Sequence, residues 1–137
     1  MKIKFLNFNH SHSEYENKEI KEYTILVDNI EYLFVSWSDN KSGEMFLKNL
    51  ETDEIIEEYE PGPIFEREKT KNKIFLALQS LCWAYTSLAE AFECGDISNG
   101  DVIDTSLFDL NDSTIDFTEI EGAIIKIECK KISFSKF

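Results

Sequence analysis

The most regular hydrophobic pattern of this chain runs from Lys71 to Gly95. Apolar side chains recur there at alternating steps of four and three, the spacing that places residues on one face of an α-helix. These residues are Ile74, Leu78, Leu81, Tyr85, Leu88 and Phe92. Gly95 suits the left-handed conformation that ends many helices, and Thr70 is the expected N-cap. The pattern therefore predicts one long amphipathic helix.

The face opposite this apolar stripe mixes two kinds of residue. Its polar members are Asn72, Gln79, Thr86 and Glu90, and its apolar members are Leu76 and Trp83. A helix face that meets water is normally polar throughout. The helix is therefore predicted either to be covered on two sides or to expose an apolar spot at Leu76 and Trp83.

The chain before the helix alternates between apolar and polar residues in the manner of β-strands. Five segments have this pattern and are predicted to be strands: residues 2–8, 22–28, 31–38, 44–50 and 54–59. The pair Asp28-Asn29 favours a tight turn, so the second and third strands form a hairpin. The last two strands extend it into an antiparallel meander, which Pro61-Gly62-Pro63 ends. Residues 9–17 are predicted to be a polar loop.

The segment after the helix predicts fewer elements. Residues 96–111 form mostly an acidic loop, with one helical turn around Phe108, and residues 114–119 and 123–134 are strands. The predicted fold is a single α+β domain over residues 1–137. Its antiparallel sheet, made of the meander of hairpins and the C-terminal strands, packs against one long helix.

The composition predicts a folded cytoplasmic protein. Of 137 residues, 42% are hydrophobic and 13% aromatic, enough for a core without a metal or disulfide. The three cysteines are an odd number without a Cys-x-x-Cys pair, as is typical of reduced thiols in the cytosol. The N-terminus lacks the apolar run of a signal peptide, and no segment has the ~18 apolar residues of a membrane-spanning helix.

No stretch of the sequence encodes a recognisable reaction. His10 and His12 are the only histidines, and an extended chain would place both on one side, as a metal pair requires. A third ligand would have to be a distant carboxylate, and two histidines in a polar loop are more often plain surface residues. The acidic residues around Gly100 do not have the spacing of an EF-hand, and the predicted helix activates neither Cys82 nor Cys94. We therefore expect no enzyme activity and no cofactor.

Charge is the most informative feature of the sequence. With 27 acidic and 14 basic residues the net charge is −13, which disfavours binding to nucleic acid or to anionic membranes. The acidic residues gather in two blocks free of Lys and Arg. The first block is Glu51, Asp53, Glu54, Glu57, Glu58 and Glu60, and the second includes Asp96, Asp101, Asp104, Asp109 and Asp112. Such blocks either keep a protein soluble or bind a basic partner, with Trp83 or Trp37 as an aromatic anchor.

A small acidic chain with two such blocks and no catalytic motif resembles the immunity proteins that bacteria make against contact-delivered toxins, many of which are basic nucleases. The resemblance lies in composition and charge alone. It implies a cytoplasmic inhibitor that neutralises a toxin by covering its active or substrate-binding surface. A phage-type nucleic-acid mimic would have the same profile. The sequence is also compatible with a metal-dependent hydrolase that uses His10 and His12, and with a structural subunit of a larger assembly.

Overall fold

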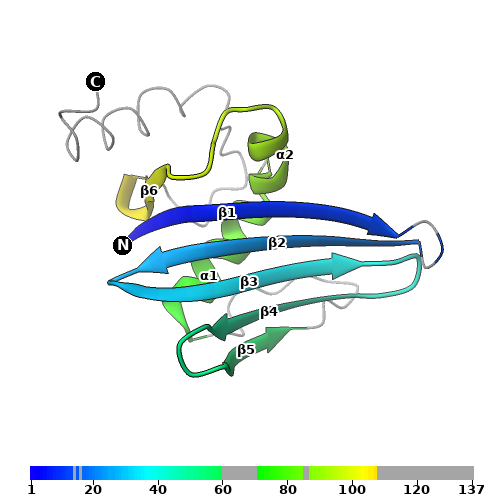
Figure 1. Cartoon of the computed structure of the whole chain (residues 1–137), viewed down its shortest axis with the longest axis horizontal. Coiled ribbons are helices and arrows are strands. Elements are labelled where there is room, and N and C mark those ends of the chain that lie inside the picture. The colour runs from blue at the N-terminus through cyan, green and yellow to red at the C-terminus, as the bar shows by residue number, and fades with distance from the viewer. Residues whose placement is uncertain (14, 16, 60–70, 85–86, 108–137) are drawn as a thin grey trace.

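A computed structural model of the chain describes residues 1–13, 15, 17–59, 71–84 and 87–107. Its main element is a six-stranded antiparallel sheet with the strand order β5-β4-β3-β2-β1-β6 (Figure 1). The strands are β1 (Lys2–Ser13), β2 (Lys18–Val27), β3 (Ile30–Ser38), β4 (Gly43–Asn49), β5 (Glu54–Tyr59) and β6 (Val102–Asp104). The helices are α1 (Lys73–Cys82), α2 (Leu88–Glu93) and the 3-10 turn η2 (Thr105–Leu107). The predicted α+β class with an antiparallel sheet is confirmed.

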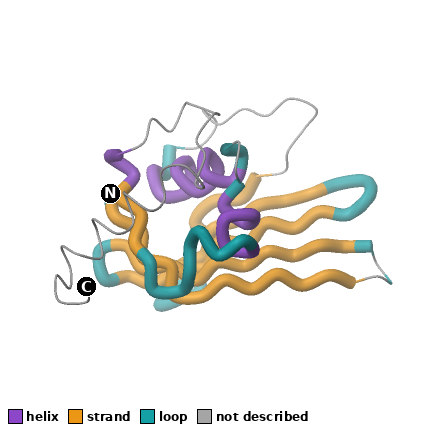
Figure 2. The backbone as a smooth tube through the Cα atoms, turned by 90° about the horizontal axis from the view of Figure 1, so that it is seen from above, coloured by secondary structure: helices purple, strands orange, loops and turns teal. Residues whose placement is uncertain are grey.

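Both α-helices lie on the same face of the sheet (Figure 2). We call this face the inner face, and the opposite one the outer face. Residues of α1 and α2 join those of the inner face in one hydrophobic cluster. Within the described residues, no helix is long and apolar enough to cross a membrane.

The central hairpin forms because its turn residues tolerate the backbone conformation of a tight turn. Asp28 and Asn29 have positive φ angles of 51° and 65°, as in the type I′ turn whose twist matches that of the flanking strands. β2 and β3 then pair without a break from Val27 and Ile30 onwards. The predicted hairpin, and its extension through β4 and β5, are confirmed.

β1 is longer than predicted. It continues through residues 9–13, which the sequence assigned to a polar loop, and pairs with β2 as far as Ser13 and Lys18. A register shift between Phe5 and Asn7 changes the alternation of its side chains. The loop prediction was wrong because backbone hydrogen bonds to β2 hold this half of the strand, and they do not require apolar side chains.

β6 lies within the segment that the sequence predicted to be an acidic loop. It pairs with the start of β1, from Lys2 and Asp104 to Lys4 and Val102. Three residues are too few to establish a periodicity. Only the presence of β1, distant in the sequence, turns these residues into a strand.

The long helix predicted from Lys71 to Gly95 is wrong, because this segment forms two helices. Trp83 is the C-cap of α1, and Ser87 is the N-cap of α2. The hydroxyl oxygen of Ser87 accepts a hydrogen bond from the backbone N–H of Glu90, and the hydroxyl donates to the carboxylate of Glu90, both at 3.3 Å. Ser87 is thus an N-cap that starts a new helix within a continuous apolar period.

The first helix begins later than predicted. Asn72 is its N-cap, and its side-chain oxygen accepts a hydrogen bond from the backbone N–H of Phe75 at 3.0 Å. Asparagine is as good an N-cap as any residue type, whereas threonine is somewhat weaker. The prediction that Thr70 caps the helix is therefore replaced by Asn72.

The core lies between the inner face and the two helices. Its fully buried members are Ile3, Phe5, Tyr23, Ile25, Phe34 and Leu47 from the sheet and Phe75, Leu78, Leu81 and Leu88 from the helices. Phe92 of α2 packs edge-to-face on Phe5 and stacks on Phe8, with ring centroids 5.3 and 4.8 Å apart. The predicted sheet-facing stripe is confirmed at its described positions, with Ile74 and Phe92 only half-buried at its margin. Tyr85, which was predicted to belong to the stripe, lies outside the described residues.

The face of α1 that was predicted to be polar is only partly so. Gln79 is buried, which contradicts the prediction, and Leu76 is half-buried. Trp83 is 37% exposed. The apolar spot expected at these positions is therefore exposed at Trp83.

Other predictions concern residues outside the described ranges. They are the end of the meander at Pro61-Gly62-Pro63, the helical turn around Phe108, and the strands at residues 114–119 and 123–134. These stay predictions.

Candidate functional site

The first acidic block follows the edge of the sheet that β5 forms. Glu51, Asp53, Glu54 and Glu58 are exposed and Glu57 is half-buried, whereas Glu60 lies outside the described residues. β5 is the outermost described strand on its side of the sheet. We call the five described residues the acidic edge.

Within the part of the chain that the structure describes, one lysine forms an ion pair with the acidic edge. The ammonium nitrogen of Lys48 lies 2.6 Å from Oδ1 of Asp53. Asp53 is 83% exposed, and an exposed pair of this kind contributes only about 0–1 kcal/mol to stability. The other four carboxylates form no ion pair with a described residue.

An apolar strip on the outer face adjoins the acidic edge. Successive side chains of a strand point to opposite faces of the sheet. Val35 and Phe46 directly follow or precede the core residues Phe34 and Leu47 of their strands, so they lie on the outer face. The register places Glu22, Val35, Phe46 and Glu58 in one row across β2 to β5. Two apolar side chains are thus flanked by a carboxylate at each end of the row.

The neighbouring rows widen this strip. In one neighbouring row, Trp37 of β3 lies between Ile20 of β2 and Glu44 of β4. In the other, Leu33 of β3 lies between Thr24 and Lys48, and Ile55 of β5 follows Lys48. The ammonium nitrogen of Lys18 stands 4.2 Å from the centre of the Trp37 ring. Ile55 is 48% exposed. We call Leu33, Val35, Trp37, Phe46 and Ile55 the outer apolar strip.

The second acidic block lies at the opposite edge of the sheet, and its described members serve the local fold. Oδ2 of Asp101 accepts a hydrogen bond from the backbone N–H of Ser98 at 2.9 Å. Oδ1 of Asp104 accepts hydrogen bonds from the backbone N–H and the hydroxyl of Ser106, at 3.0 and 2.6 Å. Oδ2 of Asp96 is buried and has no hydrogen-bond partner among the described residues. Asp109 and Asp112 lie outside the described ranges.

The sheet topology therefore separates the two blocks. β5 and β6 are the two ends of the strand order, so the acidic edge and the second block do not form one continuous surface. The sequence predicted both blocks as partner-binding residues. The structure leaves four of the five residues of the acidic edge exposed, whereas Asp101 and Asp104 are half-buried and accept hydrogen bonds from Ser98 and Ser106.

Asp104 provides a pH-dependent contribution to stability. The hydrogen bond from the Ser106 hydroxyl lowers the pKa of Asp104, and the nearby N-terminal amine lowers it further. A carboxyl whose pKa is lower in the folded protein stabilises it above the unfolded pKa, and this contribution is lost as the pH falls through the folded pKa.

Replacement of Asp104 by alanine is therefore expected to reduce stability at pH 7 by no more than about 1 kcal/mol, because charges near the surface are screened. The difference between the variant and the wild type should shrink as the pH falls below about 4. Urea denaturation from pH 7 to pH 2 measures it. Glu31→Ala, a change at an exposed carboxylate, serves as the control. A difference that stays constant over the whole pH range would contradict the assignment.

The two tryptophans proposed as anchors lie on different layers. Trp37 belongs to the outer apolar strip, near Glu44. Trp83 lies at the end of α1, in the helix layer, and lines a pocket on the inner face. Trp37 is therefore the tryptophan that shares a surface with Phe46, and the role of Trp83 as an anchor stays a prediction.

His10 and His12 lie on β1 and not in a loop. Their register partners are Lys21 and Glu19, so both imidazoles are on the same face, as an extended chain requires. Nδ1 of His10 lies 3.1 Å from Glu93, and Nδ1 of His12 lies 3.9 Å from Glu19. The described residues contain no group of three or more His, Cys, Asp or Glu side chains arranged to hold a metal ion.

The outer apolar strip was not identified from the sequence as a site. A signal was present, because Tyr32 to Trp37 is apolar at almost every position, which indicates a strand with apolar residues on both faces. One face of β3 joins the core. The other face is covered by neither of the described α-helices, and this makes it a candidate surface for a partner.

Comparison with known proteins adds no family to this description. No protein-family model, no curated protein and no solved structure matches the chain. The function proposed below therefore rests on the geometry of the acidic edge and the outer apolar strip.

Proposed function

We propose that this protein is an acidic inhibitor of the immunity-protein type, which binds a basic protein toxin through the acidic edge and the outer apolar strip. The observation that supports the proposal is the row Glu22, Val35, Phe46 and Glu58, in which the buried Val35 and the half-buried Phe46 lie between carboxylates on the sheet face that neither described α-helix covers. This arrangement has the anatomy of a protein interface, with an apolar centre and a polar rim.

The two parts of the surface have different roles. The carboxylates of the acidic edge attract a basic partner from a distance, which raises the association rate by a factor of ~10 to 1,000 and weakens as salt is added. The apolar centre acts after contact. Phe46 and Trp37 are aromatic side chains of the kind that contribute most to binding once water is excluded, and they slow dissociation.

The toxin in this proposal is a nuclease, because a nuclease binds its polyanionic substrate on a basic surface. A negatively charged sheet edge competes for that surface. The inhibitor then needs no catalytic residue of its own, and its action follows from covering the site where the nucleic acid binds.

The test uses the product of the gene adjacent to this one as the candidate partner. Co-expression is expected to protect cells from that product, and the purified pair is expected to form a complex whose association slows steeply with salt. Full protection by a chain with His10→Ala and His12→Ala is also expected. Loss of protection in this double variant, together with bound metal in the wild type, would favour the metal-dependent hydrolase instead. A complex with a DNA-binding protein in place of the adjacent gene product would favour the nucleic-acid mimic.

A further inference from the structure

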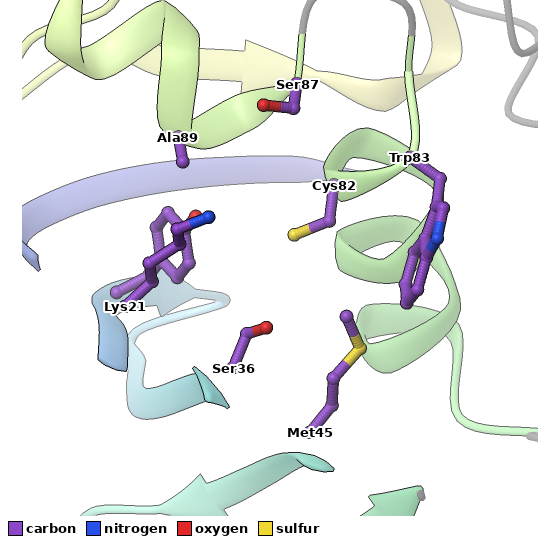
Figure 3. Close-up of a pocket in the computed structure, with 8 residues that line it drawn as sticks. Lys21, Ser36, Met45, Cys82, Trp83, Ser87 and Ala89 are labelled. Carbon is purple, nitrogen blue, oxygen red and sulfur yellow. The ribbon is translucent and has the colours of Figure 1, made fainter. Parts of the chain in front are cut away.

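A pocket of about 150 Å³ opens on the inner face, where the sheet meets the end of α1 and the start of α2 (Figure 3). It is lined by Lys21, Tyr23, Ser36, Met45, Cys82, Trp83, Ser87 and Ala89. A cavity of this size can hold a group about as large as benzene. The pocket lies on the face opposite the outer apolar strip, so its role is independent of the proposed function.

Among the described residues that line the pocket, Lys21 is the only charged one. It is half-buried, and no carboxylate of the described residues lies within 4.0 Å of its ammonium group. The nearby carboxylates of Glu93 and Glu19 face His10 and His12 instead. In a chain with a net charge of −13, a half-buried cation with no counterion among the described residues indicates a place for an external anion.

The other described residues that line the pocket do not supply that negative charge. Figure 3 shows the side chains of Lys21 and Cys82 directed toward one another across the pocket. Burial raises the pKa of the Cys82 thiol to about 12, so it is protonated at neutral pH. Burial also raises the pKa of the Tyr23 phenol, which shares a hydrogen bond with this thiol. Both groups are neutral, and neither neutralises the ammonium group.

The other residues that line the pocket combine one hydrogen-bonding group with apolar surface. Ser36 is the register partner of both Lys21 and Met45, and its hydroxyl makes no hydrogen bond to another described residue. Met45 and Ala89 are buried apolar residues, and Trp83 adds the face of an indole ring. The pocket therefore places a cation and a hydroxyl beside a ring-sized apolar space.

We propose that this pocket binds a small organic carboxylate with an apolar body of about one ring. Lys21 and Ser36 hold the carboxylate, and Met45, Trp83 and Ala89 surround the apolar body. Inorganic phosphate can bind Lys21 and Ser36 but has no apolar body. A neutral aromatic molecule fits the apolar space but carries no charge for Lys21.

The experiment follows the indole signals of the full chain by NMR during titration with benzoate. A Trp37→Phe background leaves Trp83 as the only tryptophan. Benzyl alcohol and inorganic phosphate are titrated in parallel. Saturable binding of benzoate at millimolar concentrations or below is expected, with both comparison probes binding much more weakly. Equal binding of benzoate and phosphate, or of benzoate and benzyl alcohol, would overturn the proposed ligand class.

Two variants locate the binding in this pocket. Lys21→Gln is expected to weaken benzoate about tenfold or more, the loss that one charge-assisted hydrogen bond accounts for. Lys41→Gln, at an exposed position in the β3–β4 turn, removes the same charge and should leave the affinity unchanged. Ser36→Met fills the pocket and should abolish binding. Undiminished binding in a folded Lys21→Gln variant, or no saturable binding by the wild type, refutes the proposal.

Discussion

Replacing Leu81 with alanine is expected to lower the free energy of unfolding by about 2–5 kcal/mol. Leu81 is fully buried in the last turn of α1 and belongs to the hydrophobic cluster that joins this helix to the inner face of the sheet. The variant loses the transfer free energy of the removed carbon atoms and leaves a cavity that the neighbouring side chains fill only in part. Chemical denaturation measures the loss, and the m-value is expected to be the same in the variant and the wild type.

The matched control is Leu50→Ala, which makes the same chemical change in the turn after β4. Leu50 is 40% exposed, so the control is expected to cost less than about 1 kcal/mol. Equal losses in the two variants would show that α1 does not pack on the sheet through this face.

Reversing the charge of the acidic edge is expected to slow association with the toxin at least about tenfold at low salt. The variant carries Glu54→Lys and Glu58→Lys, both at exposed positions on β5. Glu58 lies beside Phe46 in the row that crosses the outer face. A basic partner then meets repulsion where the wild type offers attraction, so the salt dependence of the association rate should also become shallower. Stopped-flow association over a range of salt concentrations measures both effects.

The control for this variant carries Glu19→Lys and Glu31→Lys, at exposed positions on β2 and β3. It changes the net charge by the same amount but leaves the acidic edge intact. An equal loss of rate in the control would show that only the overall charge matters. If neither variant changes the association rate or its salt dependence, the acidic edge is a solvated surface. Asp101 and Asp104 are unsuitable for such reversal, because their carboxylates accept hydrogen bonds that hold the loop before and after β6.

Phe46 gives an independent test of the apolar centre. If the outer apolar strip lies in the interface, Phe46→Ser should accelerate dissociation while leaving the association rate and its salt dependence nearly unchanged, because steering depends on charge. A change in association alone would place Phe46 outside the interface.

The sequence by itself determined those parts of the protein whose cause is local. Asp28-Asn29 accepts the positive φ angles of a tight turn, so the central hairpin and its register could be predicted from the turn and from the alternation of the strands. The apolar period of α1 and α2 likewise identified the residues that pack on the sheet. The break between these helices also had a local cause, because Ser87 caps α2 through the backbone N–H of Glu90 and the Ser-x-x-Glu pattern typical of a helix start was present in the sequence.

Only the tertiary structure decided which of the charged residues are available to a partner. Both acidic blocks look alike in the sequence, but the strand order places them at opposite edges of the sheet. The pairing of β6 with β1 turns Asp104 toward its own loop, whereas β5 leaves Glu54 and Glu58 in solvent. Likewise, Lys21 and Cys82 meet in one pocket only because α1 packs across β2. These features depend on contacts between residues far apart in the chain, and no local pattern of residue types records such contacts.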